Sequence, residues 1–436
     1  MPASMRFATC SRTCVATPTR WPCRCGWMRR KPLFPPVDKA SGQRLLSKGV
    51  EDHSTLTING RVSLARKRYF LKGQGSRSPL DALVDMAEAT VSVATRGLCV
   101  GLNGNSKSFE RANENLKAAA QLQMSGEKLR QIVEAEGKRV LALEVSGQLS
   151  PLWMAAQCKV LAPDGQELTR VYMGCDGFMA PLVTEVEKQK RLAKVKQRRQ
   201  KRGKKAKPLP LAKTGADGPW KEFKLVFFYD QEMEYRHVAL TRGNCEAAGL
   251  LMSREAGRLG FAAADERVGN IDGGPWIINQ IEFQQMPMSA TGLDFYHLSQ
   301  HVYAAGNAVF GEEDEAGKAW VATLLHRVKH EGYEAMWEHL LEWRKELTRS
   351  KRKAADKLIH YVAERKEMIL YPEFLARGWQ IGSGPTECQC RLLPDRLKGA
   401  GMRWDADNAE AVMALEAMRI SGQSPGYWQR CISSPN

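Results

Sequence analysis

The stretch Thr169-Arg-Val-Tyr-Met-Gly-Cys-Asp-Gly177 decides the fold, because it has the pattern of a short strand that ends at an Asp-Gly pair. Two β-rich runs follow, residues 222–229 and 234–241, and the four residues between them are predicted as a turn. Residues 245–259 then carry apolar side chains at helical spacing. Residues 267–272 form another strand, which also ends at an aspartate followed by glycine.

The order strand, hairpin, helix, strand predicts the opening of an RNase H-like α/β domain. A run dominated by Lys and Arg, residues 188–207, interrupts it. This run fits a DNA-binding loop, and it equally fits a solvated helix or a disordered insert. From Asp294 onward nearly every segment has a helical pattern, with tryptophans that we expect in the core.

Residues 54–69 predict a β-hairpin, because alternating β-formers flank Asn59-Gly60 and both turn residues should adopt positive φ. The second strand carries three consecutive basic residues, Arg66, Lys67 and Arg68. They fit an arm that grips phosphate groups, and equally an edge strand protected by charge.

Helices follow this hairpin. Ser78-Pro79 predicts a helix start, with the helix running to about Arg96. Ser108 and Ser125 each predict the N-cap of a further helix. Two short helices joined this closely fit a helix-turn-helix that exposes Lys128, Arg130 and Lys138, although any helical hairpin has the same outline.

The composition favours a polyanionic partner. The chain has 436 residues and a formal net charge of +17, which points to nucleic acid first and an anionic membrane second. No apolar run approaches the ~18–20 residues of a membrane span. The 11 cysteines, with no apolar signal peptide before them, suggest free thiols in a reducing compartment such as the cytoplasm.

Residues 1–50 are rich in Cys, Arg and Pro and predict a disordered leader. Cys10, Cys14, Cys23 and Cys25 also suggest a zinc site, but their spacings are not those of a usual zinc ribbon. The first thirty residues, free of Asp and Glu, also fit a transit peptide, although prolines interrupt any amphipathic helix there.

Three carboxylates are candidates for metal-dependent phosphoryl transfer: Asp176, Asp272 and Glu387. An aspartate at a strand end before glycine suits this chemistry, because the sheet fixes the side chain and the loop lets a nucleic acid approach. Glu387 follows Gly384-Pro385, which places it in the first turn of a helix. Two Mg²⁺ or Mn²⁺ ions, held by all three, would be the cofactor. Taken singly, each aspartate is an ordinary turn residue.

Two further groups accompany these carboxylates. Asp294, His297 and His301 share one helix face, which is either a zinc site lacking nearby ligands or an ordinary pair of histidines. Downstream of Glu387, four basic residues flank a glycine-rich break and suggest a strip of phosphate contacts: Arg391, Arg396, Lys398 and Arg403.

At these residues the sequence resembles the Kra-type insertion-sequence transposases, bacterial DDE enzymes related to the Mutator-like superfamily. The resemblance is strongest in Arg377-Gly-Trp-Gln-Ile-Gly-Ser-Gly-Pro-Thr-Glu387 and in Asp395-Arg-Leu-Lys-Gly-Ala-Gly-Met-Arg-Trp404. It extends through residues 272–277, 293–297 and 176–177, and covers most of the chain after residue 50. Each motif alone is weak, but their common order is specific.

The resemblance implies a catalytic triad of Asp176, Asp272 and Glu387, with Asp294 and His297 as a supporting Asp-x-x-His motif and Asp294 as the reserve second carboxylate. We therefore expect a leader 1–50, a β-hairpin and helical DNA-binding region 51–150, an RNase H-like core 165–310 with a basic insert 186–213, and the rest of the core at 379–436. The resemblance implies that residues 311–378 are an all-α insertion.

The implied activity is DNA cleavage at the element ends and strand transfer into target DNA. The partners would be the terminal inverted repeats and target DNA, bound by a homo-oligomer in a nucleoid-associated synaptic complex. The sequence departs from its relatives at Asn270-Ile271, where they tend to have Gly, and it lacks their cysteine pair between Lys67 and Ser78. A catalytically inactive or repurposed DNA-binding derivative is the alternative, and a nuclease that never integrates is a third possibility.

Overall fold

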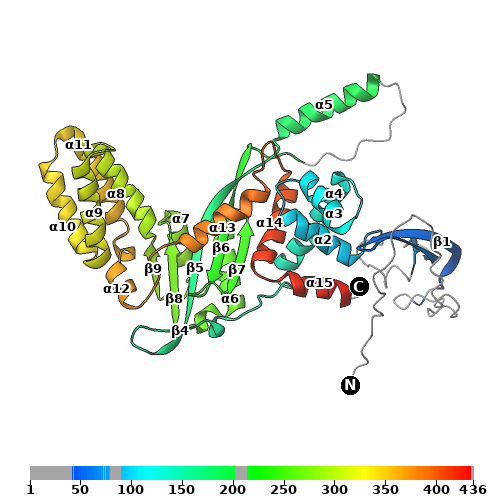
Figure 1. The fold of residues 1–436 in the computed structure, drawn as a ribbon, viewed down its shortest axis with the longest axis horizontal. Helices are drawn as coiled ribbons and strands as arrows, with labels where there is room; N and C mark the ends of the chain where they lie inside the picture. The colour runs from blue at the N-terminus through cyan, green and yellow to red at the C-terminus, as the bar shows by residue number, and fades with distance from the viewer. Residues whose placement is uncertain are drawn as a thin grey trace. The chain divides into compact units, whose positions relative to one another are not determined.

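The computed structural model of the protein describes residues 42, 44–71, 73, 75–78, 90–201 and 214–433. Within these residues the structure is mixed α/β (Figure 1). It divides into a smaller unit, residues 1–53 and 65–83, and a larger unit, residues 54–64 and 84–436. Most of the predicted leader, including its four cysteines, lies outside the described residues, but a strand already begins at Leu46.

The predicted hairpin forms between β1 (Leu46–Thr57) and β2 (Gly60–Leu71), and β3 (Gly75–Arg77) completes a three-stranded sheet. Its turn differs from the prediction, because Gly60 has a φ of 103° whereas Asn59 is not among the described residues with positive φ. The turn residues are Ile58 and Asn59, and a left-handed glycine follows them. This is the three-residue class of hairpin loop, in which only the glycine needs the left-handed region.

The prediction of one helix from Ser78 to about Arg96 is wrong at residues 90–92, although residues 93–96 are helical. Residues 79–89 lie outside the described residues, Val91 forms a β-bridge with Leu56, and helix α2 (Val93–Gly104) begins only after the N-cap Ser92. The two later helices are confirmed: Ser108 caps α3 (Phe109–Ala120) and Ser125 caps α4 (Gly126–Val145). In both, the cap hydroxyl accepts a hydrogen bond from the third backbone N–H of the helix.

The larger unit contains a central sheet with the strand order β7-β6-β5-β8-β9. The central strand β5 pairs antiparallel with β6 and parallel with β8, and β9 continues the parallel side. A short strand, β4, also pairs with β5. The strands are β4 (Lys159–Leu161), β5 (Glu167–Pro181), β6 (Trp220–Tyr229), β7 (Arg236–Thr241), β8 (Glu266–Ile271) and β9 (Ala290–Leu293).

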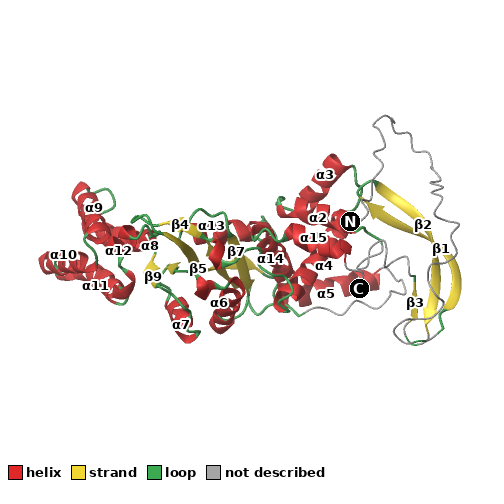
Figure 2. Cartoon of the chain, turned by 90° about the horizontal axis from the view of Figure 1, so that it is seen from below, coloured by secondary structure: helices red, strands yellow, loops and turns green. Residues whose placement is uncertain are grey.

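Both faces of this sheet are buried, which explains its nearly continuous apolar strands. Alternate side chains of β5 enter two different cores, with Val171 and Met173 in one and Tyr172 and Phe178 in the other. Helices α6 (Cys245–Leu259) and α7 (Pro275–Phe283) cover the first face, whereas α13 (Gly384–Leu392) and α14 (Ala406–Ile420) lie on the second (Figure 2).

A bundle of helices follows β9. It begins at Phe295 rather than at residue 311, because the first helix, α8, packs against the later helices α9 and α11. Trp320 and Trp343 stack inside it with ring centroids 4.0 Å apart, so these tryptophans are core residues as expected. The bundle helices are α8 (Phe295–Phe310), α9 (Glu315–His330), α10 (Tyr333–Glu346), α11 (Arg349–Ala363) and α12 (Tyr371–Ala376).

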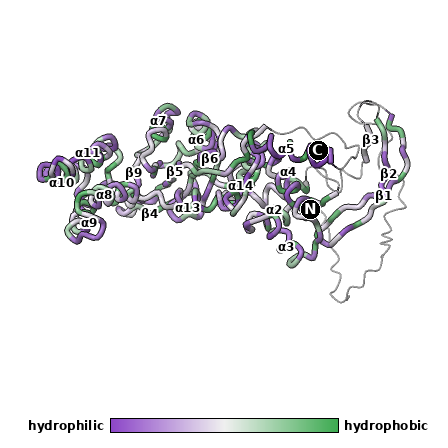
Figure 3. Tube along the Cα trace, turned by 90° about the horizontal axis from the view of Figure 1, so that it is seen from above, coloured by the Kyte–Doolittle hydropathy of each residue, from purple (hydrophilic) through white to green (hydrophobic). Residues whose placement is uncertain are grey.

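The remaining elements are short except for one basic helix, α5 (Glu185–Lys201), which buries none of its side chains and is mostly hydrophilic (Figure 3). It contains the first part of the predicted basic run, and residues 202–213 lie outside the described residues. No helix in the described part of the chain is long and apolar enough to span a membrane. The other elements are η2 (Ala155–Gln157), η3 (Phe261–Ala263), η4 (Lys366–Met368), η5 (Leu393–Arg396) and α15 (Ser424–Ser433).

Candidate metal site at the carboxyl ends of three parallel strands

Three aspartates share one level across the parallel strands. Every β5–β8 pair, such as Met173 with Gly269, differs by 96 in residue number, and so do Asp176 and Asp272. Every β8–β9 pair differs by 22, and so do Asp272 and Asp294. Continued past the last paired residues, this register sets the three aspartates opposite one another, just beyond the ends of β8 and β9 and within β5. Directly opposed residues of parallel strands project to the same face.

Asp176 lies within β5, whereas the sequence predicted that the strand would end at it. The strand continues because β6 pairs with it as far as Pro181, although β8 no longer pairs there. The carboxylate accepts the N–H of Gly177 at 2.6 Å and a hydrogen bond from the Cys390 thiol. Burial raises the pKa of Asp176, and the nearby Asp272 carboxylate adds to this, while these hydrogen bonds and His297 oppose it.

Asp272 follows β8 directly, as predicted. Its Oδ1 accepts the N–H of Gly274 at 2.8 Å, which holds the turn against the side chain. Gly273 has a φ of 77°, and its carbonyl accepts hydrogen bonds from Nε and Nη2 of Arg365 at 3.2 and 2.9 Å. The buried Arg365 comes from the helical bundle and clamps this turn. No local pattern in the sequence pointed to it, because its partner is 92 residues away.

Glu387 lies in the first turn of α13, where Pro385 also sits, as the sequence predicted. The helix approaches β5 closely: a Cβ on Gly174 would lie 1.8 Å from Oγ1 of Thr386. Since Asp176 is two residues from Gly174, it points to the same face of β5. The missing side chain at Gly174 therefore lets Glu387 reach the level of the aspartates.

Asp294 is fully buried and connects this group of residues. Its Oδ2 accepts the N–H of His297 at 2.9 Å and caps α8, and its Oδ1 accepts the N–H of Ser383 at 2.8 Å. The hydroxyl of Ser383 donates to Oε1 of Glu387 at 3.1 Å. Asp294 thus ties the start of the bundle to the start of α13, and both of its oxygens already serve backbone donors.

The three predicted carboxylates surround one cavity of about 230 Å³. They come from β5, from the turn after β8 and from α13, which are far apart in the sequence. Asp294 does not line the cavity. The lining residues are Cys175, Asp176, Asp272, His297, Gln300, Ser383, Thr386 and Glu387.

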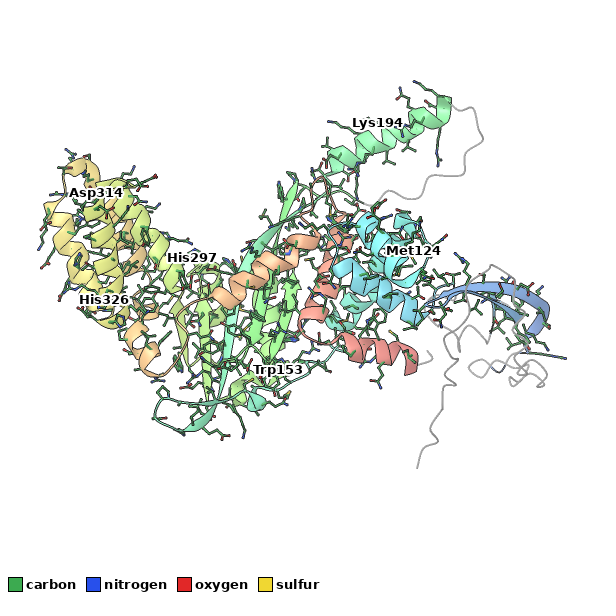
Figure 4. The ribbon with its side chains drawn as sticks, in the orientation of Figure 1. Met124, Trp153, Lys194, His297, Asp314 and His326 are labelled. Carbon is green, nitrogen blue, oxygen red and sulfur yellow. The ribbon has the colours of Figure 1, made fainter. Side chains whose placement is uncertain are left out.

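A second grouping overlaps the first. Ligand atoms of Asp294, His297 and Glu387 all lie within 4.8 Å of one another, the spacing of a possible metal site. The two groupings share Glu387 and His297, but we favour the cavity carboxylates as metal ligands because Asp294 is already bonded through both oxygens. His297 lies on α8 where the bundle meets the sheet and α13 (Figure 4).

One buried polar atom at the cavity, Nδ1 of His297, has no hydrogen-bond partner among the described residues. Unpartnered buried polar atoms are destabilising unless a ligand or water satisfies them. Carboxylate oxygens are the donors that Mg²⁺ and Mn²⁺ prefer. The donor set therefore fits one or more hard divalent cations. His301, the other histidine of the predicted group, instead stacks on Tyr361 at 3.7 Å, and burial lowers its pKa.

The predicted DNA-contacting residues of the N-terminal half are partly neutralised. In the smaller unit, Arg66 and Arg68 both pair with Glu51 at 2.8 Å, whereas Lys67 is exposed. On α4, Arg130 pairs with Glu127 and Glu134, both at 2.7 Å, and Lys128 is half-buried. The same helix packs against α14, and a Cβ on Gly137 would lie 2.3 Å from the carbonyl oxygen of Ala411. One side of α4 is therefore buried in the core, and only its exposed side is left to contact DNA.

The predicted strip after Glu387 is divided. Arg391 and Lys398 are exposed, but Arg396 is only 3% exposed and hydrogen-bonds Asn103. Arg403 bonds the carbonyl of Leu182 and pairs with Glu187 at 3.1 Å. The four residues therefore do not form one continuous exposed row.

Comparison of the chain with known protein families and with curated proteins finds no match.

Proposed function

We propose that the cavity holds divalent metal ions and that the chain is a DDE transposase, which cleaves DNA at element ends and joins it to target DNA. The observation that carries the metal-dependent chemistry is the convergence of Asp176, Asp272 and Glu387 on one cavity. The strand order, with two aspartate-bearing parallel strands side by side, supports an RNase H-like catalytic domain. The transposition itself rests on the sequence resemblance.

Bound Mg²⁺ or Mn²⁺ ions would stabilise charge on the attacking and leaving oxygens of a phosphodiester and help to activate the nucleophile. The protein positions the ligands. The backbone N–H groups of Gly177 and Gly274 each engage Oδ1 of an aspartate, at 2.6 and 2.8 Å, and so orient the second oxygen of each carboxylate. Ser383 orients Glu387 in the same way. Such fixed hydrogen bonds reduce the reorganisation needed in the transition state.

The first test is metal binding by the full chain, measured with Mn²⁺ by calorimetry. We expect Asp176→Asn, Asp272→Asn and Glu387→Gln each to weaken Mn²⁺ binding at least tenfold, because each removes a charged ligand. Glu313→Gln is the matched control, since Glu313 is 95% exposed and lies on the helical bundle. Equal Mn²⁺ affinity in all four variants and the wild type would contradict the assignment of the ligands.

The second test is chemistry on DNA. The wild-type chain should nick and then join DNA that carries the ends of its own element, only when Mg²⁺ or Mn²⁺ is present. Asp176→Asn and Glu387→Gln should abolish nicking while DNA binding survives. Nicking by either variant at the wild-type rate would refute the triad. Metal and DNA binding without nicking would instead favour a repurposed DNA-binding protein, and nicking without joined product a plain nuclease.

A further inference from the structure

A second and larger cavity, of about 780 Å³, lies in the larger unit outside the carboxylate site. We call it the basic groove. It brings together the end of α2, the start of β7, the segment from α13 to η5 and the end of α14. Its charged lining residues are Lys107, Arg236, Asp395, Arg396, Lys398 and Arg419.

Positive charge predominates in this groove, because five cations face one carboxylate, Asp395. Three of the cations, Lys107, Arg236 and Lys398, are exposed and form no ion pair with any residue that the structure describes. Among the described residues Arg419 pairs with Glu416 at 2.8 Å, and the same carboxylate also interacts electrostatically with Arg396. A groove lined by an excess of positive charge attracts anions.

The floor of the groove is rigid, because contacts with its neighbours hold Arg396 in place. Arg396 is buried, donates from Nε and Nη2 to Oδ1 of Asn103 at 3.1 and 2.7 Å, and lies over the ring of Phe109 at 4.2 Å. Burial lowers the pKa of Arg396 to about 10, which still leaves the guanidinium charged at neutral pH. A cation held in place by packing binds an anion with little loss of conformational entropy.

Two further features fix the walls. The indole N–H of Trp153 (Figure 4) donates to the carbonyl of Arg236 at 3.2 Å, which anchors the start of β7. Gln389 of α13 is only 5% exposed, lines the groove and has no hydrogen bond to its amide from the described residues. The amide is a hydrogen-bonding group that the groove offers to a polar ligand.

We propose that the basic groove binds the phosphodiester backbone of a nucleic-acid strand. The volume is that of a site for a ligand much larger than one phosphate, since sites of ~300–1,000 Å³ hold whole drug-sized molecules. The cations come from four separate segments, which suits a row of charges. A duplex strand carries one phosphate per ~3.4 Å of helix axis, so cations from four segments can contact several successive phosphates.

Helix α13 links the groove to the carboxylate site. Glu387 lines the carboxylate cavity, whereas Gln389 and Leu392 of the same helix line the groove. At ~1.5 Å per residue the five residues from Glu387 to Leu392 span about 7.5 Å, or roughly two nucleotide steps of a strand. The binding proposal does not depend on the proposed chemistry, although a strand held in the groove would run towards the carboxylates.

The experiment measures binding of a short fluorescein-labelled DNA duplex to the full chain by anisotropy, with EDTA present so that no metal-dependent step occurs. The groove variant is Lys107→Ala with Arg236→Ala and Lys398→Ala. The control variant, Arg349→Ala with Lys351→Ala and Lys353→Ala, removes three exposed charges from α11. We expect the slope of log affinity against log salt to fall by about 2.7 in the groove variant, about 0.9 per lost contact.

Two further measurements test the direction of the charge effect and the kind of ligand. Asp395→Asn removes the carboxylate of the groove and should tighten DNA binding severalfold. Inorganic phosphate, and separately polyglutamate, are added as competitors at equal charge. The proposal is overturned if the groove variant keeps the wild-type slope, or if either competitor displaces DNA as well as unlabelled oligonucleotide does. Calorimetry with Mn²⁺ on the wild-type chain scores the carboxylate site separately, so failure of one proposal can be told from failure of the other.

Discussion

The substitution Gly174→Ala tests how the carboxylates are brought together. The new Cβ would lie 1.8 Å from Oγ1 and 2.8 Å from Cβ of Thr386, whereas ordinary contacts begin at 3.4 Å. The start of α13 must therefore move away from β5 by up to about 1.6 Å, since a packed interior has no space to absorb the clash. Glu387 is the next residue after Thr386, so its carboxylate moves with the helix.

The expected stability loss is about 1–3 kcal/mol, as for other overpacked core sites. The expected loss of metal-dependent DNA nicking is larger, about 100-fold, because a displacement of ~1 Å at a reacting centre has an effect of that size. Urea unfolding measures the first quantity, and the initial nicking rate at saturating Mn²⁺ measures the second. The nicking rates of the variant and the wild type are compared at a temperature where the variant is fully folded.

Two further variants distinguish the clash from a general effect of removing glycine. Thr386→Ala removes Oγ1, so in the double variant the nearest atom is Cβ at 2.8 Å, and most of the required movement disappears. The double variant should therefore recover activity relative to Gly174→Ala. Gly257→Ala in α6 is the control, because its Cβ would meet nothing within 4 Å. If Gly174→Ala nicks DNA at the wild-type rate, the close approach of α13 does not set the geometry of the site.

Two other predictions concern the stability that buried carboxylates provide and its dependence on pH. Glu136 accepts from Arg96 at 2.8 Å and from the Tyr427 hydroxyl in the core, so Glu136→Ala should lower the free energy of unfolding by about 3–5 kcal/mol in urea denaturation. Glu255 is buried, which alone would raise its pKa, but the hydrogen bond from His237 and nearby arginines outweigh this and lower the pKa to about 2. The carboxylate therefore stabilises the fold fully above pH ~4.5, and this contribution is lost as the pH falls towards 2. In Glu255→Gln the acid limb of a stability-against-pH curve should flatten in that window; an unchanged limb would show that Glu255 does not carry it.

Local signals in the sequence set the helix boundaries well. Residues 245–259 were predicted as a helix and form α6 with the same ends, because Asn244 caps its start and Gly260 adopts the left-handed conformation after its end. Ser108 and Ser125 act in the same way. Signals of this kind fail where a tertiary contact decides. Residues 90–92 stay extended because Leu56 bonds Thr90 and Ser92, which are more than thirty residues away.

Local sequence signals of this kind could not predict the basic groove. Arg396 and Lys398 suggested a strip of phosphate contacts, but their companions in the groove, Lys107, Arg236 and Arg419, come from three other segments. Nothing in a local pattern pairs these segments. The same pattern also did not reveal that Arg396 would be buried and stack on Phe109, since residues near 100 and residues near 400 meet only in the fold.

The choice between Asp272 and Asp294 shows what the fold adds to the candidate site. Both follow parallel strands, and the register places them on one level with Asp176, so neither spacing nor position separates them. Their hydrogen bonds do. Asp294 is fully buried and serves the backbone N–H groups of His297 and Ser383 through its two oxygens, whereas Asp272 is partly exposed, lines the cavity and engages one backbone N–H. A carboxylate that joins two helix starts is suited to holding the site together, and one that faces the cavity with an oxygen to spare is suited to binding an ion there.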